Sequence, residues 1–231
     1  MHDTKHNHSA PVANAAEKSP VEVQADASIM LRLRESTKEL HTRVERHPVQ
    51  AGLLRGTSNL GEYALYLSQM YHAQTALDSA CEAMAVSESA IRAVFRPYHV
   101  RAQHAHADLL AINHPLADAL PASQRFIGWI NSLAAQRNVA LLGVLYVLEG
   151  STNGGTFIAG AMRKTVPLPV GAGTAFLDPH GAQQRERWTA FKSDADALLL
   201  DEPARLAILD AASRTFLALE SIFDDMAAQK S

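Results

Sequence analysis

The chain has 231 residues, of which 47% are hydrophobic and 19% are charged, the balance of a globular protein whose core can be buried in one domain. A net charge of −3 argues against a general nucleic-acid-binding protein, because such a protein needs a basic surface. No apolar run is long enough to span a bilayer, and no apolar signal-peptide core occurs near the N-terminus. The single cysteine, Cys81, fits a reducing compartment, so we expect a cytoplasmic protein that is neither secreted nor embedded in a membrane.

Residues 1–28 are rich in Ala, Ser, Pro, Asn and charge and show no hydrophobic periodicity, which predicts a disordered tail. The first helix is expected over residues 29–46, where apolar residues recur at helical spacing until Pro48 stops the helix. The second helix is expected to begin after Asn59, with Glu62 placed to complete a capping box, and to fray near residue 84.

Helical patterns continue through the rest of the chain. Six further helices are predicted over residues 89–95, 100–112, 121–136, 139–164, 182–199 and 203–226. No stretch shows the alternation of a strand, and no internal repeat is present. The predicted fold is therefore all-α: a single-domain bundle of seven to eight helices over residues 29–228.

The predicted helix over residues 139–164 is unusual in its glycine content. Its glycines are Gly143, Gly150, Gly154, Gly155 and Gly160. Each costs a helix about 0.5–1 kcal/mol relative to alanine. On a helical wheel the first three fall nearly in line, so this face has almost no side chains. Two interpretations remain open: close packing against another helix, or a flat ligand lying against the bare backbone.

His41 lies in the apolar stripe of the first predicted helix, where a lone histidine is more often a core residue than a metal ligand. Two neighbours favour ligation. Glu45, one turn later, can accept a hydrogen bond from the ring nitrogen that does not bind the metal. Arg34, two turns or about 10.5 Å earlier, can reach an anionic group at the edge of a ligand centred over His41.

Two segments carry a family resemblance. LRESTKELHTRVE, around His41, and YVLEGSTNGGTFIAG, in the glycine-bearing helix, resemble the signature segments of the haem oxygenase family, especially its bacterial branch. Later segments, AFLDPHG and ASRTFLALESIFDDM, resemble the C-terminal helices of that family, so the resemblance extends over about residues 29–228. It implies a haem-oxygenase-like fold, with haem b (iron) as both substrate and cofactor. The implied reaction opens the ring to biliverdin, carbon monoxide and iron with O2 and external electrons.

The resemblance also assigns roles by position. His41 would be the axial ligand of the haem iron, and Glu45 would be its hydrogen-bonding partner. Arg34 would match a basic residue near a haem propionate. The distal face of the haem would be covered by the following residues: Gly150, Ser151, Gly154 and Gly155.

Three departures from the family pattern bear on the predicted site. Ser151 stands where animal-type members have an aspartate that organises distal water, a loss that bacterial members share. Asn153 replaces an apolar residue, which would alter haem orientation. Lys192 is the one cation where animal enzymes hold propionates, and Asp194 and Asp196 would repel propionates if they faced inward.

The implied partners are haem, O2 and an electron donor such as a ferredoxin or a flavin reductase, with a bacteriophytochrome as a candidate biliverdin acceptor. Arg92, Arg96 and Arg101 predict a cationic patch for an acidic donor, although such a cluster is usually a solvated face. The alternatives are a non-catalytic haem-binding carrier or sensor on the same scaffold, and a different helical enzyme such as a di-iron oxidase or a thiaminase-like hydrolase. No Glu-x-x-His pair, which a di-iron site usually needs, occurs in the chain.

Overall fold

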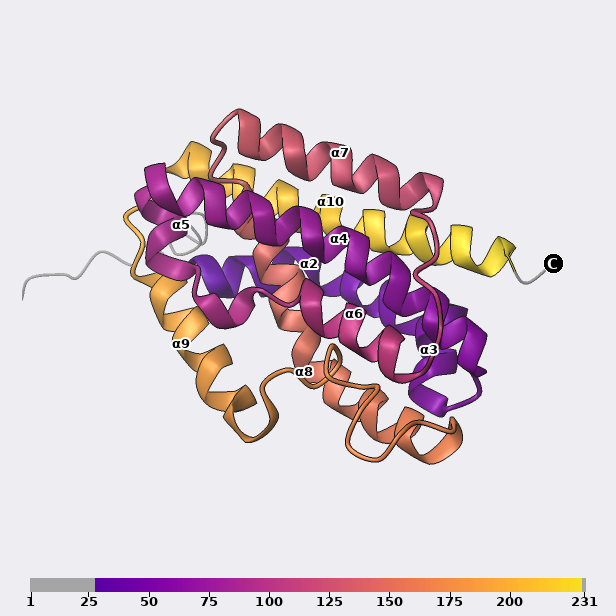
Figure 1. The fold of residues 1–231 in the computed structure, drawn as a ribbon. Coiled ribbons are helices and arrows are strands. Elements are labelled where there is room, and N and C mark those ends of the chain that lie inside the picture. Colours follow the sequence, from indigo (N-terminus) through magenta and orange to yellow (C-terminus); the bar gives the residue numbers. More distant parts are fainter. Residues whose placement is uncertain (1–27, 230–231) are drawn as a thin grey trace, which may run out of the picture.

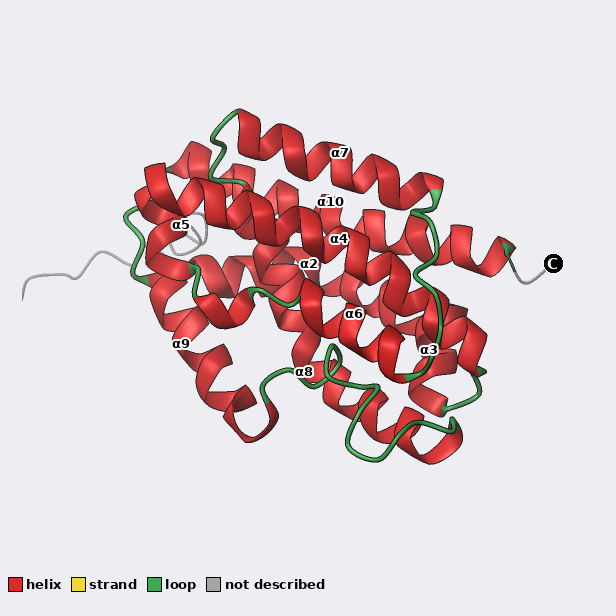
Figure 2. Ribbon diagram, viewed as in Figure 1, coloured by secondary structure: helices red, strands yellow, loops and turns green. Residues whose placement is uncertain are grey.

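The computed structural model describes residues 28–229, which form nine α-helices, two short 3₁₀ helices and no strand (Figures 1 and 2). The helices are α2 (Ile29–Arg46), α3 (Pro48–Arg55), α4 (Leu60–Ser87), α5 (Ser89–Val94), α6 (Ala102–Ala111), α7 (Pro121–Ala135), α8 (Leu141–Thr165), α9 (Gln184–Asp196) and α10 (Glu202–Ala228). The 3₁₀ helices are η1 (Pro97–His99) and η2 (Gly181–Gln183). The all-α prediction is confirmed, with one helix more than expected. The predicted tail, apart from Ser28, lies outside the described residues.

Local capping signals set several helix ends where the sequence predicts them. The Asn59 side chain accepts a hydrogen bond from the Glu62 backbone N–H at 2.9 Å, and the Glu62 carboxylate accepts one from the Asn59 N–H at 3.2 Å. This reciprocal pair is a capping box, and it starts the 28-residue helix α4. Asp201 caps α10 by accepting from the Ala204 N–H at 2.9 Å.

Helix α3 is the element that the sequence does not predict. Pro48 ends α2, as expected, but it also occupies the first turn of α3, where its missing N–H is not needed by the helix. The His47 ring caps α3, because its Nδ1 accepts from the Val49 N–H at 3.2 Å. Gly56, in the left-handed conformation at φ 67°, ends the helix. A proline that stops one helix therefore starts the next.

The helices pack around one continuous hydrophobic core. Helices α2 and α8 both pack on α10, while α4 packs against α6 and α7. Gly143 explains the close approach of α8 to α10, because a Cβ there would overlap the Ile208 carbonyl oxygen. At this end of α8 the helix-packing interpretation of the glycine stripe therefore holds. The two halves of α8 run in different directions in Figure 1.

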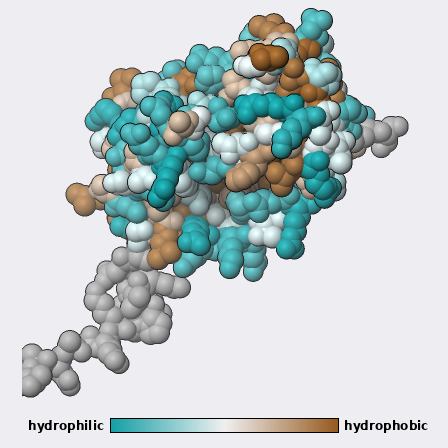
Figure 3. Space-filling view, turned by 90° about the horizontal axis from the view of Figure 1, so that it is seen from below, coloured by the Kyte–Doolittle hydropathy of each residue, from teal (hydrophilic) through white to brown (hydrophobic). Residues whose placement is uncertain are grey.

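The surface of the bundle is mainly polar. The face seen from below in Figure 3 shows polar side chains interrupted by separate apolar patches. Within residues 28–229, every helix is too short or too polar to cross a membrane.

Candidate functional site

A cavity of about 800 Å³ lies between α2 and α8 and is closed by side chains from α3, α4, α9 and α10. Its volume is typical of a small-molecule site. Most of the lining side chains are apolar or aromatic. The polar residues of the lining are His41, Glu45, Gln50, Gln74, Arg101, Ser151 and Asn153. The structure therefore brings six of the nine predicted site residues together: His41, Glu45, Ser151 and Asn153, with Gly150 and Gly154, whose backbone also lines the cavity.

The α2 wall of the cavity carries His41 and Glu45. His41 is 55% exposed at its side chain, and its Nδ1 lies 3.5 Å from the Glu45 carboxylate, the distance of an ion pair rather than a short hydrogen bond. The His41 ring packs edge-on against Phe216 of α10, with 5.6 Å between the ring centroids. Because Nδ1 faces the carboxylate, Nε2 is the ring nitrogen left for a ligand.

The α8 wall is bare where the sequence predicts it to be. A Cβ added at Gly154 would have no heavy atom within 4 Å, so this position opens into free space. A Cβ at Gly150 would meet the Trp188 ring at 3.4 Å, an ordinary contact. Gly155 differs, because a Cβ there would overlap the Leu177 carbonyl oxygen and it does not line the cavity. The missing side chain at Gly155 therefore makes room for the loop before α9 rather than for a ligand.

The side chains that follow Gly150 turn back onto their own helix. Ser151 Oγ donates to the Leu148 carbonyl at 2.6 Å, and Asn153 Nδ2 donates to the Gly150 carbonyl at 2.9 Å. Gln184 of α9 donates to Asn153 Oδ1 at 3.1 Å. Asn153 is thereby held between α8 and α9 at the cavity wall, a position for which an amide is suited and an apolar side chain is not.

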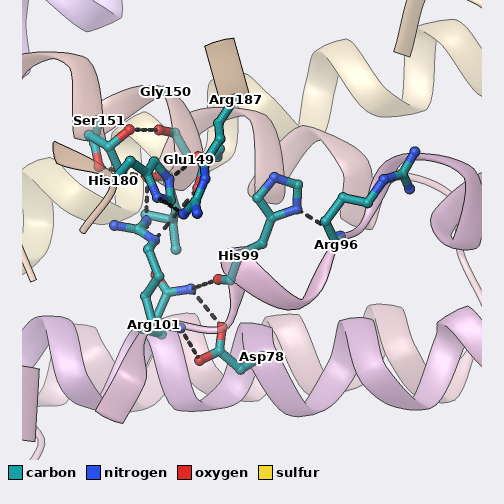
Figure 4. A network of polar contacts seen from close by, with 12 residues as sticks. Asp78, Arg96, His99, Arg101, Glu149, Gly150, Ser151, His180 and Arg187 are labelled. Carbon is teal, nitrogen blue, oxygen red and sulfur yellow. Dashed lines mark hydrogen bonds and ion pairs between the residues drawn. The ribbon is translucent and has the colours of Figure 1, made fainter. Parts of the chain in front are cut away.

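A buried polar network lies behind the α8 wall, and the sequence does not predict it (Figure 4). His180 Nε2 lies 2.7 Å from Glu149 Oε1, and Glu149 Oε2 lies 3.6 Å from Arg101 Nε. Arg101 is 2% exposed and Glu149 is 1% exposed. Two buried charges are stable only when they are paired, so these residues depend on one another. His180 and Arg101 lie 31 and 48 positions from Glu149 along the chain, and a carboxylate interrupting the apolar run of α8 is the one signal in the sequence.

Arg101 is held from both ends. Its backbone N–H donates to Asp78 Oδ2 at 2.9 Å, and its Nη2 donates to the Leu148 carbonyl at 2.7 Å. Gln74 links the Asp78 carboxylate to the Arg101 guanidinium, and its Nε2 donates to Asp78 Oδ1 at 2.7 Å. Burial lowers the pKa of Arg101, but Glu149 and Asp78 oppose that shift. The guanidinium is therefore a fixed cation in the cavity wall.

Two tyrosines of the lining are held neutral. Burial raises the pKa of Tyr66 to about 12, with Arg101 opposing the shift. Burial also raises the pKa of Tyr146, while a hydrogen bond with Thr37 and the charge of Arg34 oppose it. Both phenols therefore keep their proton at neutral pH and act as hydrogen-bonding groups, not anions.

Arg34 and Lys192 do not line the cavity. Arg34 is exposed on α2, close enough to Tyr146 to affect its pKa, and Lys192 is half-buried on α9. The two aspartates near Lys192 face other groups: Asp194 pairs with Arg96 at 2.6 Å, and Asp196 accepts from the Met30 N–H at 3.0 Å. They do not bring negative charge into the cavity.

The predicted cationic patch does not form as expected. Arg101 is buried in the network behind α8 rather than exposed. Arg96 is neutralised by Asp194, and Arg92 donates to the carbonyls of Ala85 and Val86. Arg101 therefore does not belong to a surface patch, because the fold brings it to buried carboxylates that its position near two other arginines in the sequence does not indicate.

Comparison with known proteins identifies relatives of this chain. The family model described as "Heme oxygenase" matches residues 27–225. A Synechocystis protein named "Heme oxygenase 2" is 22% identical over 204 residues, covering 84% of this chain and 81% of that protein. The human protein named "Heme oxygenase 1" is 24% identical over 203 residues, covering 84% of this chain and 70% of its own length.

Solved structures share the fold. The crystal structure of Synechocystis heme oxygenase-2 in complex with heme and NO has a TM-score of 0.82 at 21% identity, covering 88% of this chain and 86% of the other. That of the Leptospira interrogans heme oxygenase has a TM-score of 0.78 at 20% identity, with coverage of 85% and 98%. With its family model matched over nearly the whole helical region, the chain belongs to the heme oxygenase family.

Proposed function

We propose that the chain is a haem oxygenase that binds haem in the cavity between α2 and α8. The observation that carries this proposal is the pairing of two walls: an imidazole on α2 and a helix backbone without side chains on α8. A flat, hydrophobic ring fits between such walls, and the apolar lining suits its faces. Family membership supports the same function.

His41 would hold the haem through Nε2. Its exposure to the cavity leaves that nitrogen accessible, and the Glu45 carboxylate near Nδ1 orients the ring and keeps the ligating tautomer. The edge-on contact with Phe216 restricts rotation of the imidazole. These residues bind and orient the substrate from the α2 side.

The bare face of α8 would press close to the opposite side of the ring. Gly154 leaves free space in which the ring can approach the backbone, and Gly150 backs onto Trp188. Ser151 gives its one proton to the Leu148 carbonyl, and Asn153 gives one of its two amide N–H groups to the Gly150 carbonyl. Bound haem, supplied with O2 and external electrons, would then undergo ring opening to biliverdin, carbon monoxide and iron.

The partners of the reaction are part of the proposal. The electrons would come from an external donor such as a ferredoxin or a flavin reductase, and a bacteriophytochrome would accept the biliverdin. A single buried cysteine suits a cytoplasmic protein of the bacterial branch. Arg34 and Lys192 remain predicted contacts for propionates that extend out of the cavity, and residues 29–228 remain the predicted haem-binding domain.

Addition of haemin to the purified chain, followed by a reductant in air, tests the proposal. We expect a shifted Soret band on binding, its loss on reduction, and a biliverdin isomer identified by chromatography. A haem complex that survives reduction in air would instead support the carrier or sensor. Failure to bind haemin at all would overturn both.

A further inference from the structure

Three buried polar atoms in the network behind α8 have no hydrogen-bond partner. They are His99 Nε2, Arg101 Nε and Glu149 Oε2. A buried polar group left without a partner is expensive, so these atoms require an explanation. Two of these atoms face each other, because Arg101 Nε lies 3.6 Å from Glu149 Oε2. Figure 4 shows the Arg101 side chain beside Glu149 and His180, with the His99 ring to one side of them next to Arg96.

The hydrogen-bonding role of each atom can be assigned. The Arg96 backbone N–H donates to His99 Nδ1 at 3.0 Å, so His99 Nε2 carries the ring proton and is a donor. Arg101 Nε is always a donor, and Glu149 Oε2 is an acceptor. Arg101 Nε and Glu149 Oε2, a donor and an acceptor 3.6 Å apart, match one water molecule that accepts from the first and donates to the second.

The charges of the network balance. Arg187 Nη1 lies 2.8 Å from His180 Nδ1 and can only donate, so His180 Nδ1 accepts and its Nε2–H donates to Glu149. His180 is then neutral. The anions Asp78 and Glu149 offset the cations Arg101 and Arg187.

Arg101 is the member of this network that reaches the cavity. It lines the cavity, whereas Glu149 and His180 do not. Its Nη2 donates to the Leu148 carbonyl, the same oxygen that accepts from Ser151. The Ser151 proton is therefore not available to a ligand in the cavity. Among the lining residues of the described chain, Arg101 is the one arginine, and no lysine is present.

We propose that Arg101 and Glu149 are the distal polar pair of this site. They hold one internal water between them, and the guanidinium of Arg101 supplies the positive potential and the N–H donors at the α8 wall. Arg101 is a positioning residue in this proposal, and Glu149 acts through it. The inference rests on the proposed function, because it concerns the side of the haem that faces α8.

The test uses the ferric haemin complex of the full chain and follows its acid–alkaline transition by absorption, without turnover. Positive potential favours the alkaline form. Glu149→Gln leaves Arg101 unbalanced, so the transition is expected to fall by about one pH unit. Arg101→Gln leaves Glu149 unbalanced, so the transition is expected to rise by about one pH unit. Arg101→Lys keeps the charge and should stay near the parent value.

The opposite signs separate an electrostatic role from a structural one. The remaining titratable groups of the lining are the same in all variants: His41, Glu45, Tyr66 and Tyr146. Asp108→Asn is the matched control, because Asp108 is 2% exposed and accepts from the Ala175 and Phe176 N–H groups but does not line the cavity. It should leave the transition unmoved.

The outcomes distinguish this proposal from the function on which it rests. The distal pair is overturned if the pH of the transition does not move in Glu149→Gln, or if it moves in the same direction in Glu149→Gln and Arg101→Gln. Either result leaves haem binding intact. A parent complex with no alkaline form at any pH where it stays folded also counts against it. If Arg101→Gln does not fold, Glu149→Gln carries the test alone, because glutamine preserves the shape of the side chain. No binding of haemin by the parent chain overturns the proposed function itself.

Discussion

The two walls of the cavity hold their charged groups in opposite ways. On α2, His41 and Glu45 are 55% and 61% exposed at the side chain and form a loose pair. Behind α8, Glu149 of that helix and Arg101, which directly precedes α6, are almost completely buried and belong to a network that also includes His180. An exposed pair contributes little to stability, and a buried pair is stable only while both members are present. The α2 wall is therefore free to exchange partners, while the α8 wall is part of the folded core.

The largest effect that this comparison predicts is on folding stability. Glu149→Ala leaves a buried guanidinium without its carboxylate and is expected to destabilise the protein by about 3–5 kcal/mol. Glu45→Ala removes the carboxylate of the exposed pair and is expected to cost under about 1 kcal/mol. Urea unfolding of the haem-free proteins measures both. Equal losses in the two variants would mean that the walls do not differ as described.

Acid should weaken the buried side selectively. Burial lowers the pKa of His99 from its ordinary 6.5 to about 4. Between these values the unfolded chain binds a proton that the folded chain does not, so stability falls as pH falls, by about 1.4 kcal/mol for each pH unit. Asp78 and Asp108, whose pKa burial raises, act in the opposite sense.

The contribution of His99 can be isolated by substitution. Chemical unfolding measured at several pH values between 6.5 and 4 should show a smaller loss of stability in His99→Asn than in the parent chain. Asparagine keeps an acceptor for the Arg96 N–H but does not titrate. The same slope in both proteins would show that His99 is not the group responsible.

The exposed wall is tested through the ligand. His41→Ala should weaken haemin binding by more than about 100-fold, because it removes the ligand itself and the loss of a residue that merely supports a metal ligand already costs about 10–100-fold. The haem-free protein should melt near the parent temperature, because the side chain is mostly exposed. A titration followed at the Soret band measures the affinity. Added imidazole should restore the parent spectrum, and an unchanged spectrum without imidazole would exclude His41 as the ligand.

A smaller effect is expected from filling the bare face of α8. Gly154→Leu places a side chain in the free space of the cavity and should weaken haemin binding about tenfold, or 1.4 kcal/mol. Gly160→Leu is the matched control, because a Cβ there also meets nothing within 4 Å but the residue does not line the cavity. Both proteins should fold, since leucine favours a helix over glycine. Equal affinity in the two would contradict the assignment of Gly154.

Much of the fold could be predicted because its signals are local. The capping box of Asn59 and Glu62 acts over three residues and marks the start of α4 correctly. Pro48 shows the limit of such signals, since the same residue is compatible with the end of one helix and the start of another. Helix α3 depends on the neighbouring sequence, where the His47 ring caps its start and the left-handed Gly56 ends it.

The site could be predicted only on one side. His41 and Glu45 are one helical turn apart, so their proximity follows from the helix alone. Arg101, Glu149 and His180 come from three separate segments, and only the packing of α8 against the rest of the bundle brings them together. The same reason explains Gly155: its neighbour is Leu177, and no spacing within α8 indicates it.

The adjacent glycines Gly154 and Gly155 therefore tolerate replacement differently, although they are neighbours in the chain. A library of side chains at position 154 would sample the size and shape of the molecules that the protein admits, with its scaffold preserved. The same library at position 155 would select only variants that still fold, because any side chain there would overlap the carbonyl of Leu177. Redesign of this protein toward other flat molecules should begin at the first glycine and leave the second untouched.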